Sequence, residues 1–575
     1  MSSHFGSLKP DLRRNATGWA VCAIACVIYI PSLFSEFIRD DHFQIVNNPQ
    51  IQSWDYLPRL FSTPLWSQLG AEQAVHFYRP LFSTWMLVVN TIGGLSPAWW
   101  HFSSIFLHAV TTLAVYKLCD NLLQNRVAAL FAASLFAVHP IHVDAVSWVS
   151  ASNEVLFTLL ALGAIIVLLA PDASVPLTPF RLAASAALYG AALLTKETAV
   201  ALLPVLLLIV LLRGAERRKV VRTAYWYGFV TLGYFAIRWW ALGKIGTEES
   251  KHSWREVLLS SPSVLAFYLR KLVFPLHLSG FYVNPITSSL TIRLWFTAGG
   301  LLIAAALLTW VALHYSHLVG LGASIIIFPL LPALLGIRIY PQGDMTHDRY
   351  LYLPSVGLCL LFGMLAQWLW TYPKPVKVIF LTASAALLVV FAILTIRQQR
   401  FYKSDEAFYQ RAIDLDPTNV YVIDSFGAIH LESGEWDRAM KEFKRAFQLA
   451  PNDPNAIYNL AHGLFETHQY AEAEPLLRQV SGSPELESKR KAILLTLADT
   501  KVSLGNLSGA DGVLQELNQL DPKFPALHRT LGIVFQREGR INEAQAEYHK
   551  EFQVSGDMQA EQQAIALKQA LSPSR

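Results

Sequence analysis

The sequence predicts an all-α protein in which a polytopic bundle of membrane helices is followed by an α-solenoid of helical repeats. The chain has 575 residues and is 53% hydrophobic but only 15% charged, whereas soluble proteins carry about 25% charged residues. The long apolar runs are confined to residues 16–396, and residues 403–575 have the composition of a soluble helical domain. We therefore predict a membrane domain at residues 1–400 and a repeat domain at residues 401–575.

The membrane domain contains about eleven segments that are long and apolar enough to be spans. The predicted spans are 16–38, 99–118, 126–140, 154–170, 180–195, 197–213, 222–242, 293–313, 317–336, 350–371 and 376–396. Residues 80–96 and 263–279 are apolar but interrupted or amphipathic, so we expect them to lie at the membrane surface. The first run has no small-residue cleavage site and is predicted to be a retained signal anchor.

The distribution of basic residues predicts the orientation of the chain. With the N-terminus in the cytoplasm, the basic loops at residues 117–126, 213–222 and 371–377 all lie on the inner side, in agreement with the positive-inside rule. The acidic and histidine-bearing loops then share the outer side, as does the repeat domain. We expect a multi-pass protein of the bacterial inner membrane with these parts in the periplasm, or of the endoplasmic reticulum membrane if the protein is eukaryotic.

Neither the net charge nor the cysteines indicate a nucleic-acid-binding protein or a disulfide-bonded protein. The formal charge of +4 arises from residues at membrane edges, so no nucleic-acid partner is predicted. The four cysteines fall in or beside apolar segments and do not identify a redox compartment.

A period of about 34 residues marks the second domain as tetratricopeptide repeats. Its clearest unit contains Gly427, Gly434, Trp436, Ala439, Phe443, Ala446 and Pro451. We predict about four repeats, with a leading half repeat before Pro417. Such a solenoid usually offers a groove to a partner protein, although binding does not follow from the fold alone.

The outer side of the membrane domain carries the candidate functional residues. Asp40 and Asp41 lie where the first apolar run meets water, and an ionisable group at a membrane edge costs several kcal/mol unless it is paired or hydrated. The alternative for any one of these residues is a solvated loop position. Their occurrence in separate loops on one face favours a shared cavity. The other candidates are Arg79, His139, His142, Asp144, Glu154, Lys196, Glu197, His347 and Arg349.

Several stretches together resemble one known family. They are "RDDHFQIVNNPQI", "FYRPLFSTWMLVVN", "LFAVHPIHVDAVSWVSASNEVLF", "LLTKETAVALLPVLLL" and "HDRYLYLPSVGLCLLF". In this order, followed by repeats, they resemble the transmembrane and tetratricopeptide repeat-containing family of the GT-C superfamily, which is related to protein O-mannosyltransferases. The resemblance implies an inverting transfer of a monosaccharide, mannose or another hexose, from a polyprenyl phosphate to a hydroxyl, with Ser or Thr of an extracytoplasmic protein as the acceptor.

The resemblance also suggests roles for the candidate residues. A general base must accept the acceptor's proton, and cations must stabilise the departing phosphate. Asp41 or Asp40 is expected to be the base. Arg349, then Lys196 and His347, are expected to bind the donor phosphate. Acceptor or sugar contacts are expected from Asp144, Glu154, Arg79, His139, His142 and Glu197.

Two of these assignments have alternatives. Lys196 and Glu197 could instead form an ion pair at a helix junction. His139, His142 and Asp144 have a spacing that would allow a divalent metal, but the proline between the histidines disrupts helical spacing and no fourth ligand is evident. We therefore predict no metal site and no certain cofactor.

Three other functions compete with the transferase. A membrane-anchored repeat scaffold or assembly factor would explain the repeats, but an anchor requires one span. A transporter would place its ionisable groups near the bilayer midplane. A ligase that moves a whole lipid-linked glycan is the remaining enzymatic alternative. The sequence identifies neither the sugar nor the acceptor.

Overall fold

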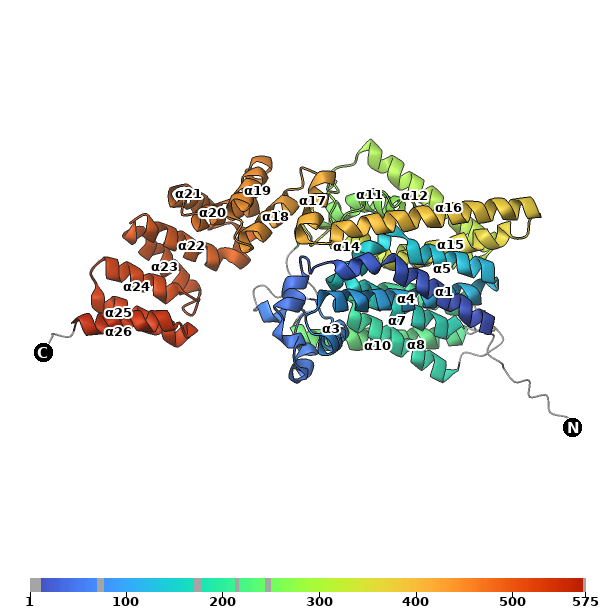
Figure 1. Cartoon of the computed structure of the whole chain (residues 1–575), viewed down its shortest axis with the longest axis horizontal. Coiled ribbons are helices and arrows are strands. Elements are labelled where there is room, and N and C mark those ends of the chain that lie inside the picture. The colour runs from blue at the N-terminus through green and yellow to red at the C-terminus, as the bar shows by residue number, and fades with distance from the viewer. Residues whose placement is uncertain (1–11, 70–76, 170–177, 213–216, 244–249, 572–575) are drawn as a thin grey trace. The chain divides into compact units, whose positions relative to one another are not determined.

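The computed structural model describes residues 12–69, 77–169, 178–212, 217–243 and 250–571 (Figure 1). All regular structure in this described part is helical, which confirms the predicted all-α class. The chain divides into two compact units, Met1–Pro417 and Thr418–Arg575. Residues 213–216 of one predicted basic loop lie outside the described residues.

The described residues of the first unit form seventeen α-helices. They are α1 Leu12–Ile28, α2 Leu57–Leu60, α3 Pro80–Gly93, α4 Pro97–Leu123, α5 Arg126–Val138, α6 Val143–Val146, α7 Asn153–Leu169, α8 Pro179–Thr195, α9 Leu203–Leu212, α10 Arg217–Leu242, α11 Trp254–Val273, α12 Ile292–His314, α13 His317–Ile327, α14 Leu331–Gly336, α15 Tyr352–Leu369, α16 Lys374–Gln399 and α17 Asp405–Leu415. A helix is present at each of the eleven predicted spans, and α3 and α11 occupy the two segments expected at the membrane surface.

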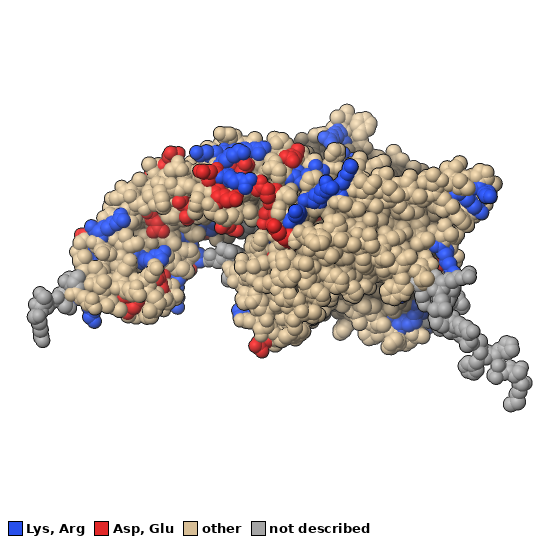
Figure 2. Space-filling view, in the orientation of Figure 1, with Lys and Arg blue, Asp and Glu red and all other residues tan. Residues whose placement is uncertain are grey.

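Seven helical segments within the described residues are long and apolar enough to cross a membrane, or up to eight if one bent pair counts as a span. The bent pair, Arg126–Val138 and Pro140–Val146, turns by 47° because Pro140 cannot continue the helix of α5. The chain is thus a multi-pass membrane protein, as predicted. The count of eleven depends on α8, α10 and the short apolar segment Glu197–Leu212, and it stays a prediction. Figure 2 shows a broad band of the bundle surface with few charged atoms.

Small residues allow the helices of the bundle to pack closely. A methyl group added at Gly357 of α15 would lie 2.4 Å from the carbonyl oxygen of Gly322 in α13. Backbones that approach to this extent are typical of membrane helices, where association relies on packing instead of the hydrophobic effect. At the centre, α4 packs against α1, α5 and α7.

Four connections between these helices meet at one end of the bundle. In the described part of the chain they are residues 29–69 with 77–79, 139–152, 195–202 and 337–351, and hydrogen bonds or ion pairs join them. Each breaks into short helical turns, and backbone of this kind must satisfy its polar groups inside the protein or with water. The sequence candidates lie in and beside these connections.

The first unit ends later than the sequence predicts. The segment that was expected to lead the repeats forms α17 and packs onto the first unit. A methyl group added at Gly280 would lie 2.3 Å from the Phe408 ring, so this packing is tight. Aromatic burial after the last span therefore places the boundary at Pro417 instead of residue 400.

The second unit is a stack of antiparallel helix pairs. Its helices are α18 Val420–Glu432, α19 Trp436–Leu449, α20 Pro454–Glu466, α21 Tyr470–Val480, α22 Arg490–Ser503, α23 Leu507–Leu520, α24 Leu527–Arg537, α25 Ile541–Ser555 and α26 Met558–Leu571. Each pair packs on the next, and the predicted small residues lie at the closest contacts, as where Gly427 meets Phe443. The four predicted repeats correspond to α18–α25, and α26 covers the last pair.

Candidate functional site

The two neighbouring acids of the first loop have different surroundings. Asp41 is completely buried, and its Oδ1 accepts hydrogen bonds from the backbone N–H of Ser150 at 2.8 Å and from the Ser150 hydroxyl. Its Oδ2 accepts one from the backbone N–H of Ile38 at 3.1 Å. These bonds join the first loop to the turn Val149–Ser152. Asp41 is therefore placed to hold the loop, and it does not line the cavities described below.

Asp40 instead lines a small polar chamber. Its side chain is 22% exposed, and its nearest charged neighbour is Arg39, whose Nε lies 3.7 Å from Oδ1. The chamber has a volume of about 80 Å³, and its walls include Gln44, Trp66, Arg79, Trp148, Asn153, Glu154, Lys196, Tyr340, Arg349 and Tyr350. Burial raises the pKa of Asp40 despite the opposing effect of Arg39, and burial raises the pKa of Asp41 to about 7. Such shifts are common where carboxylates exchange protons.

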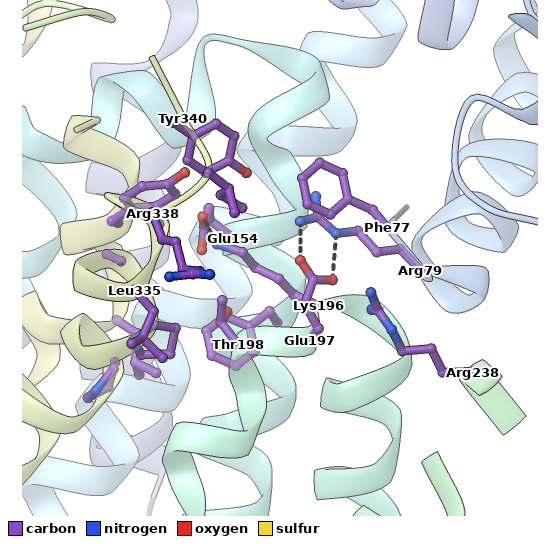
Figure 3. Close-up of a pocket in the computed structure, with 18 of the residues that line it drawn as sticks. Phe77, Arg79, Glu154, Lys196, Glu197, Thr198, Arg238, Leu335, Arg338 and Tyr340 are labelled. Atoms are coloured by element: carbon purple, nitrogen blue, oxygen red, sulfur yellow. Dashed lines mark hydrogen bonds and ion pairs between the residues drawn. The ribbon is translucent and has the colours of Figure 1, made fainter. Parts of the chain in front are cut away.

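A larger cavity shares walls with this chamber (Figure 3). Its volume is about 490 Å³, and both cavities are lined by Phe77, Arg79, Glu154, Lys196, Tyr340 and Tyr350. The larger cavity adds two cations, Arg238 from α10 and Arg338, together with apolar side chains such as Phe157 and Leu335. It can thus hold a ligand that is anionic at one end and apolar at the other.

Two ion pairs lie in the shared wall. The guanidinium of Arg79 donates to both carboxylate oxygens of Glu197, at 2.6 and 3.1 Å, as Figure 3 shows. Lys196 donates to Glu154, and both of these side chains are about 6% exposed. The first pair joins two connections and the second joins residues 195–202 to α7, so both Lys196 and Glu197 have long-range partners in place of the alternative Lys196–Glu197 pair. The four groups thus lie as two ion pairs beside the cavity.

Arg349 enters the chamber from the turn Asp348–Leu351. Its backbone N–H donates to Asp144 Oδ2 at 2.9 Å, and its Nη1 lies 3.6 Å from the same oxygen. The guanidinium lies over the rings of Trp148 and Tyr350. Among the described residues, Nη1 is a buried donor that makes no hydrogen bond. Since an unsatisfied buried donor is costly, this atom is suited to an anionic ligand.

Four further predicted site residues line neither cavity. Asp144 accepts hydrogen bonds from Arg349 and from the Tyr402 hydroxyl. His347 contacts the carbonyl oxygen of Gly280 at 2.8 Å, and it lines neither cavity. His139 contacts the carbonyl oxygen of Leu272, and His142 contacts the Ser355 hydroxyl. No group of three or more His, Cys, Asp or Glu side chains in the described part of the chain could hold a metal ion.

Sequence reasoning missed several residues of the site. Trp148 forms a platform on which both Arg39 and Arg349 lie, at 5.2 and 4.8 Å from the ring centroid. Arg39 also pairs with Asp344 at 3.1 Å. Arg39 directly precedes the two acids, and that adjacency was the available signal. Arg238 lies within an apolar run, where a cation is itself a functional-site signal.

Both domains of the chain resemble known proteins. A model described as tetratricopeptide repeat matches residues 430–484. Protein O-mannosyl-transferase TMTC1 of Homo sapiens is 25% identical and covers 79% of this chain, which in turn covers 58% of that protein. Protein O-mannosyl-transferase F38B6.6 of Caenorhabditis elegans is also 25% identical, with 75% of this chain and 62% of the relative covered. TMTC3 of Homo sapiens is 24% identical, with 79% and 53% covered.

The chain therefore spans less than two thirds of the length of these curated relatives. Among solved structures, YrrB, a TPR protein with an unusual peptide-binding site, matches with 18% identity and a TM-score of 0.26, over 32% of this chain and 90% of that one. The repeat model and the curated relatives confirm the predicted resemblance: this chain has a tetratricopeptide repeat domain, and its homologues are O-mannosyl-transferases of the transmembrane and tetratricopeptide repeat-containing family.

Proposed function

We propose that this protein is an inverting glycosyltransferase that moves a hexose, with mannose as the first choice, from a polyprenyl phosphate to a hydroxyl of an extracytoplasmic protein. The observation that carries the proposal is the pair of adjoining cavities, because Asp40, Lys196 and Arg349 all line the smaller one. The names of the relatives support mannose and a protein acceptor.

In the proposed reaction, Asp40 is the general base. Its carboxylate takes the proton of a Ser or Thr hydroxyl as the hydroxyl oxygen bonds to C1 of the sugar. The bond between C1 and the phosphate oxygen breaks, and its electron pair leaves with the polyprenyl phosphate. Attack opposite the leaving group inverts the configuration at C1. A positioned base of this kind contributes about 10²- to 10⁴-fold to a rate.

Arg349 and Lys196 are proposed to stabilise the departing phosphate. The free donor at Arg349 Nη1 supports this assignment, and a guanidinium can bind phosphate through two hydrogen bonds. The larger cavity is proposed to receive the first part of the polyprenyl chain, because apolar side chains adjoin its cations. Arg79, Glu154 and Glu197 are proposed to hold sugar or acceptor hydroxyls near these groups.

The repeats are proposed to recruit the acceptor protein on the outer side of the membrane. Tetratricopeptide repeats commonly bind peptides and partner proteins. Both this role and the orientation rest on the basic loops of the sequence and on the family resemblance.

The proposal is tested by intact-mass spectrometry of extracytoplasmic proteins. The cells compared produce the wild-type protein, the Asp40→Asn variant or neither. We expect hexose-sized mass increments with the wild type alone. Matching profiles from cells with equal amounts of both proteins in the membrane would contradict a protein-modifying transferase and favour the scaffold.

A further inference from the structure

The segment that follows the last membrane helix contacts residues next to Asp40 and Arg349, two lining residues of the polar chamber. It comprises the turn Arg400–Tyr402 and α17, Asp405–Leu415. On one side, the Asp405 carboxylate accepts a hydrogen bond from the backbone N–H of Arg39 at 2.7 Å, and its other oxygen lies 2.7 Å from His42 Nε2. These partners flank the two acids of the first loop. Asp405 is therefore hydrogen-bonded to Arg39, the residue directly before Asp40.

On the other side, Tyr402 reaches the residue that holds Arg349. Its hydroxyl is part of a side chain that is 1% exposed, and it donates to Asp144 Oδ1 at 3.0 Å. The second oxygen of Asp144 accepts the backbone N–H of Arg349. Tyr402 and Asp405 thus connect one short segment to the two groups on which the proposed reaction depends.

Packing fixes the segment between these two contacts. Phe408 lies 6.1 Å from the Trp148 ring and 5.2 Å from the Tyr402 ring. The backbone N–H of Glu36 also donates to the carbonyl oxygen of Lys403 at 2.9 Å. The segment is consequently held to the loop by backbone, side-chain and aromatic contacts.

The conformation of Arg39 requires such support. Its φ is +50°, in the left-handed region that a non-glycine residue seldom adopts without surrounding contacts. The hydrogen bond from the Arg39 N–H to Asp405 stabilises the rotated peptide.

We propose that Tyr402 and Asp405 are positioning residues that hold the base and the phosphate-binding arginine at the separation required for transfer. This inference rests on the proposed function. Neither residue touches the substrate; each acts through a neighbour, Asp405 through Arg39 and Tyr402 through Asp144. A displacement of about 1 Å in an active site can reduce a rate by about 10²-fold. Loss of the Asp405 contact therefore affects turnover more than donor binding, whereas loss of the Tyr402 contact, which acts on Arg349, affects donor binding as well.

The test uses the full-length protein with the variants Asp405→Ala, Asp405→Asn and Tyr402→Phe. Asparagine keeps an oxygen that can accept the Arg39 N–H and serves as the conservative rescue. Asp414→Asn is the matched control, because Asp414 is an exposed acid on the same helix. Three quantities are measured: kcat, the KM for the polyprenyl-phosphate sugar, and hydrogen exchange of the amides in residues 36–46.

We expect Asp405→Ala to lower kcat about 10- to 100-fold while the donor KM changes less than about threefold. Exchange in residues 36–46 should accelerate in this variant. Asp405→Asn should recover most of both losses. Tyr402→Phe should lower kcat and raise the donor KM with unchanged exchange in the first loop, and the control should match the wild type. If Asp405→Ala folds but barely perturbs kcat, or if its exchange is unchanged, the positioning role is wrong.

Failure of the proposed function can be distinguished from failure of the positioning role. If Asp40→Asn retains wild-type transfer, the base assignment is wrong whatever the Asp405 variants do. If Asp40→Asn is inactive while Asp405→Ala exchanges rapidly at full kcat, the base assignment stands and the positioning role is overturned.

Discussion

Asp41 accepts hydrogen bonds from both the backbone N–H and the hydroxyl of Ser150, a residue far along the chain. With the further bond from Ile38, three donors surround one buried carboxylate. That arrangement commits Asp41 to joining two loops, whereas Asp40 lines the chamber. The sequence pattern leaves open which of the two acids is the base, and this geometry favours Asp40.

The pH dependence of transfer should report the environment of Asp40. A base acts in its ionised form, so activity falls as the pH drops through its pKa. Because burial raises this pKa above the ordinary value of 3.8, the acid limb of kcat/KM should lie at higher pH than that of an exposed aspartate. Arg39 opposes the shift, and Arg39→Gln should move the limb further upward. Lys403→Gln, at an exposed position, is the control, and an acid limb that stays in place in Arg39→Gln would contradict the assignment.

Arg349 should contribute to donor binding through its free Nη1. Arg349→Gln is expected to raise the donor KM about 10- to 100-fold, since a hydrogen bond to a charged group is worth about 1.5–3 kcal/mol. Arg349→Lys should recover only part of the affinity, because an ammonium cannot bind in the planar, two-pronged manner of a guanidinium. Arg293→Gln, at an exposed position, is the control. An unchanged donor KM in a folded Arg349→Gln protein would remove this residue from the donor site.

Two truncations that remove the repeats at different positions should differ in donor binding and in transfer. Deletion of residues 418–575 leaves Tyr402 and Asp405 in the first unit, so donor binding should persist while use of protein acceptors is impaired. Deletion of residues 401–575 removes both contacts and should abolish transfer even to a short peptide. Binding of a labelled donor and transfer to a peptide distinguish the two truncations. Equal loss of donor binding in both would argue against a repeat domain that acts in acceptor recognition.

The repeat domain offers a stability test with a matched control. A methyl group added at Gly427 would lie 2.6 Å from the Phe443 ring, whereas one added at Gly512 has no neighbour within 4 Å. Gly427→Ala should destabilise the repeats by about 1–3 kcal/mol through overpacking. Gly512→Ala should stabilise them by about 0.5–1 kcal/mol, because alanine favours helix. Thermal unfolding followed by circular dichroism measures both, and similar effects of the two variants would contradict the packing described.

The sequence predicted the position of each membrane helix and the repeats because apolar length and a fixed period are local properties. Most of the charged residues that line the two cavities were also among the sequence candidates. Partners could not be predicted in this way: Lys196 pairs with Glu154 and not with its neighbour Glu197, since the choice depends on how α7 and α8 pack. Arg39 was overlooked because basic residues at membrane edges usually reach toward water.

The end of the membrane domain is a second feature that local sequence patterns could not predict. Residues 405–415 have the composition of a soluble helix, and Pro417 fits the repeat period. Both features predict that the segment belongs to the repeats. Its tertiary contacts, above all those of Phe408, place it in the first unit. Local propensity identified the helix, and long-range packing decided its domain.

The most direct test of the account compares Asp40→Asn with Asp41→Asn in purified, membrane-reconstituted protein supplied with polyprenyl-phosphate mannose and a Ser/Thr peptide. Asp40→Asn should bind the donor normally and lose at least about 10²-fold in kcat. Asp41→Asn should weaken the first loop, seen as faster hydrogen exchange in residues 36–46, and retain measurable transfer. If Asp40→Asn keeps wild-type turnover while Asp41→Asn is inactive with an intact loop, the base is Asp41 and the central claim is wrong.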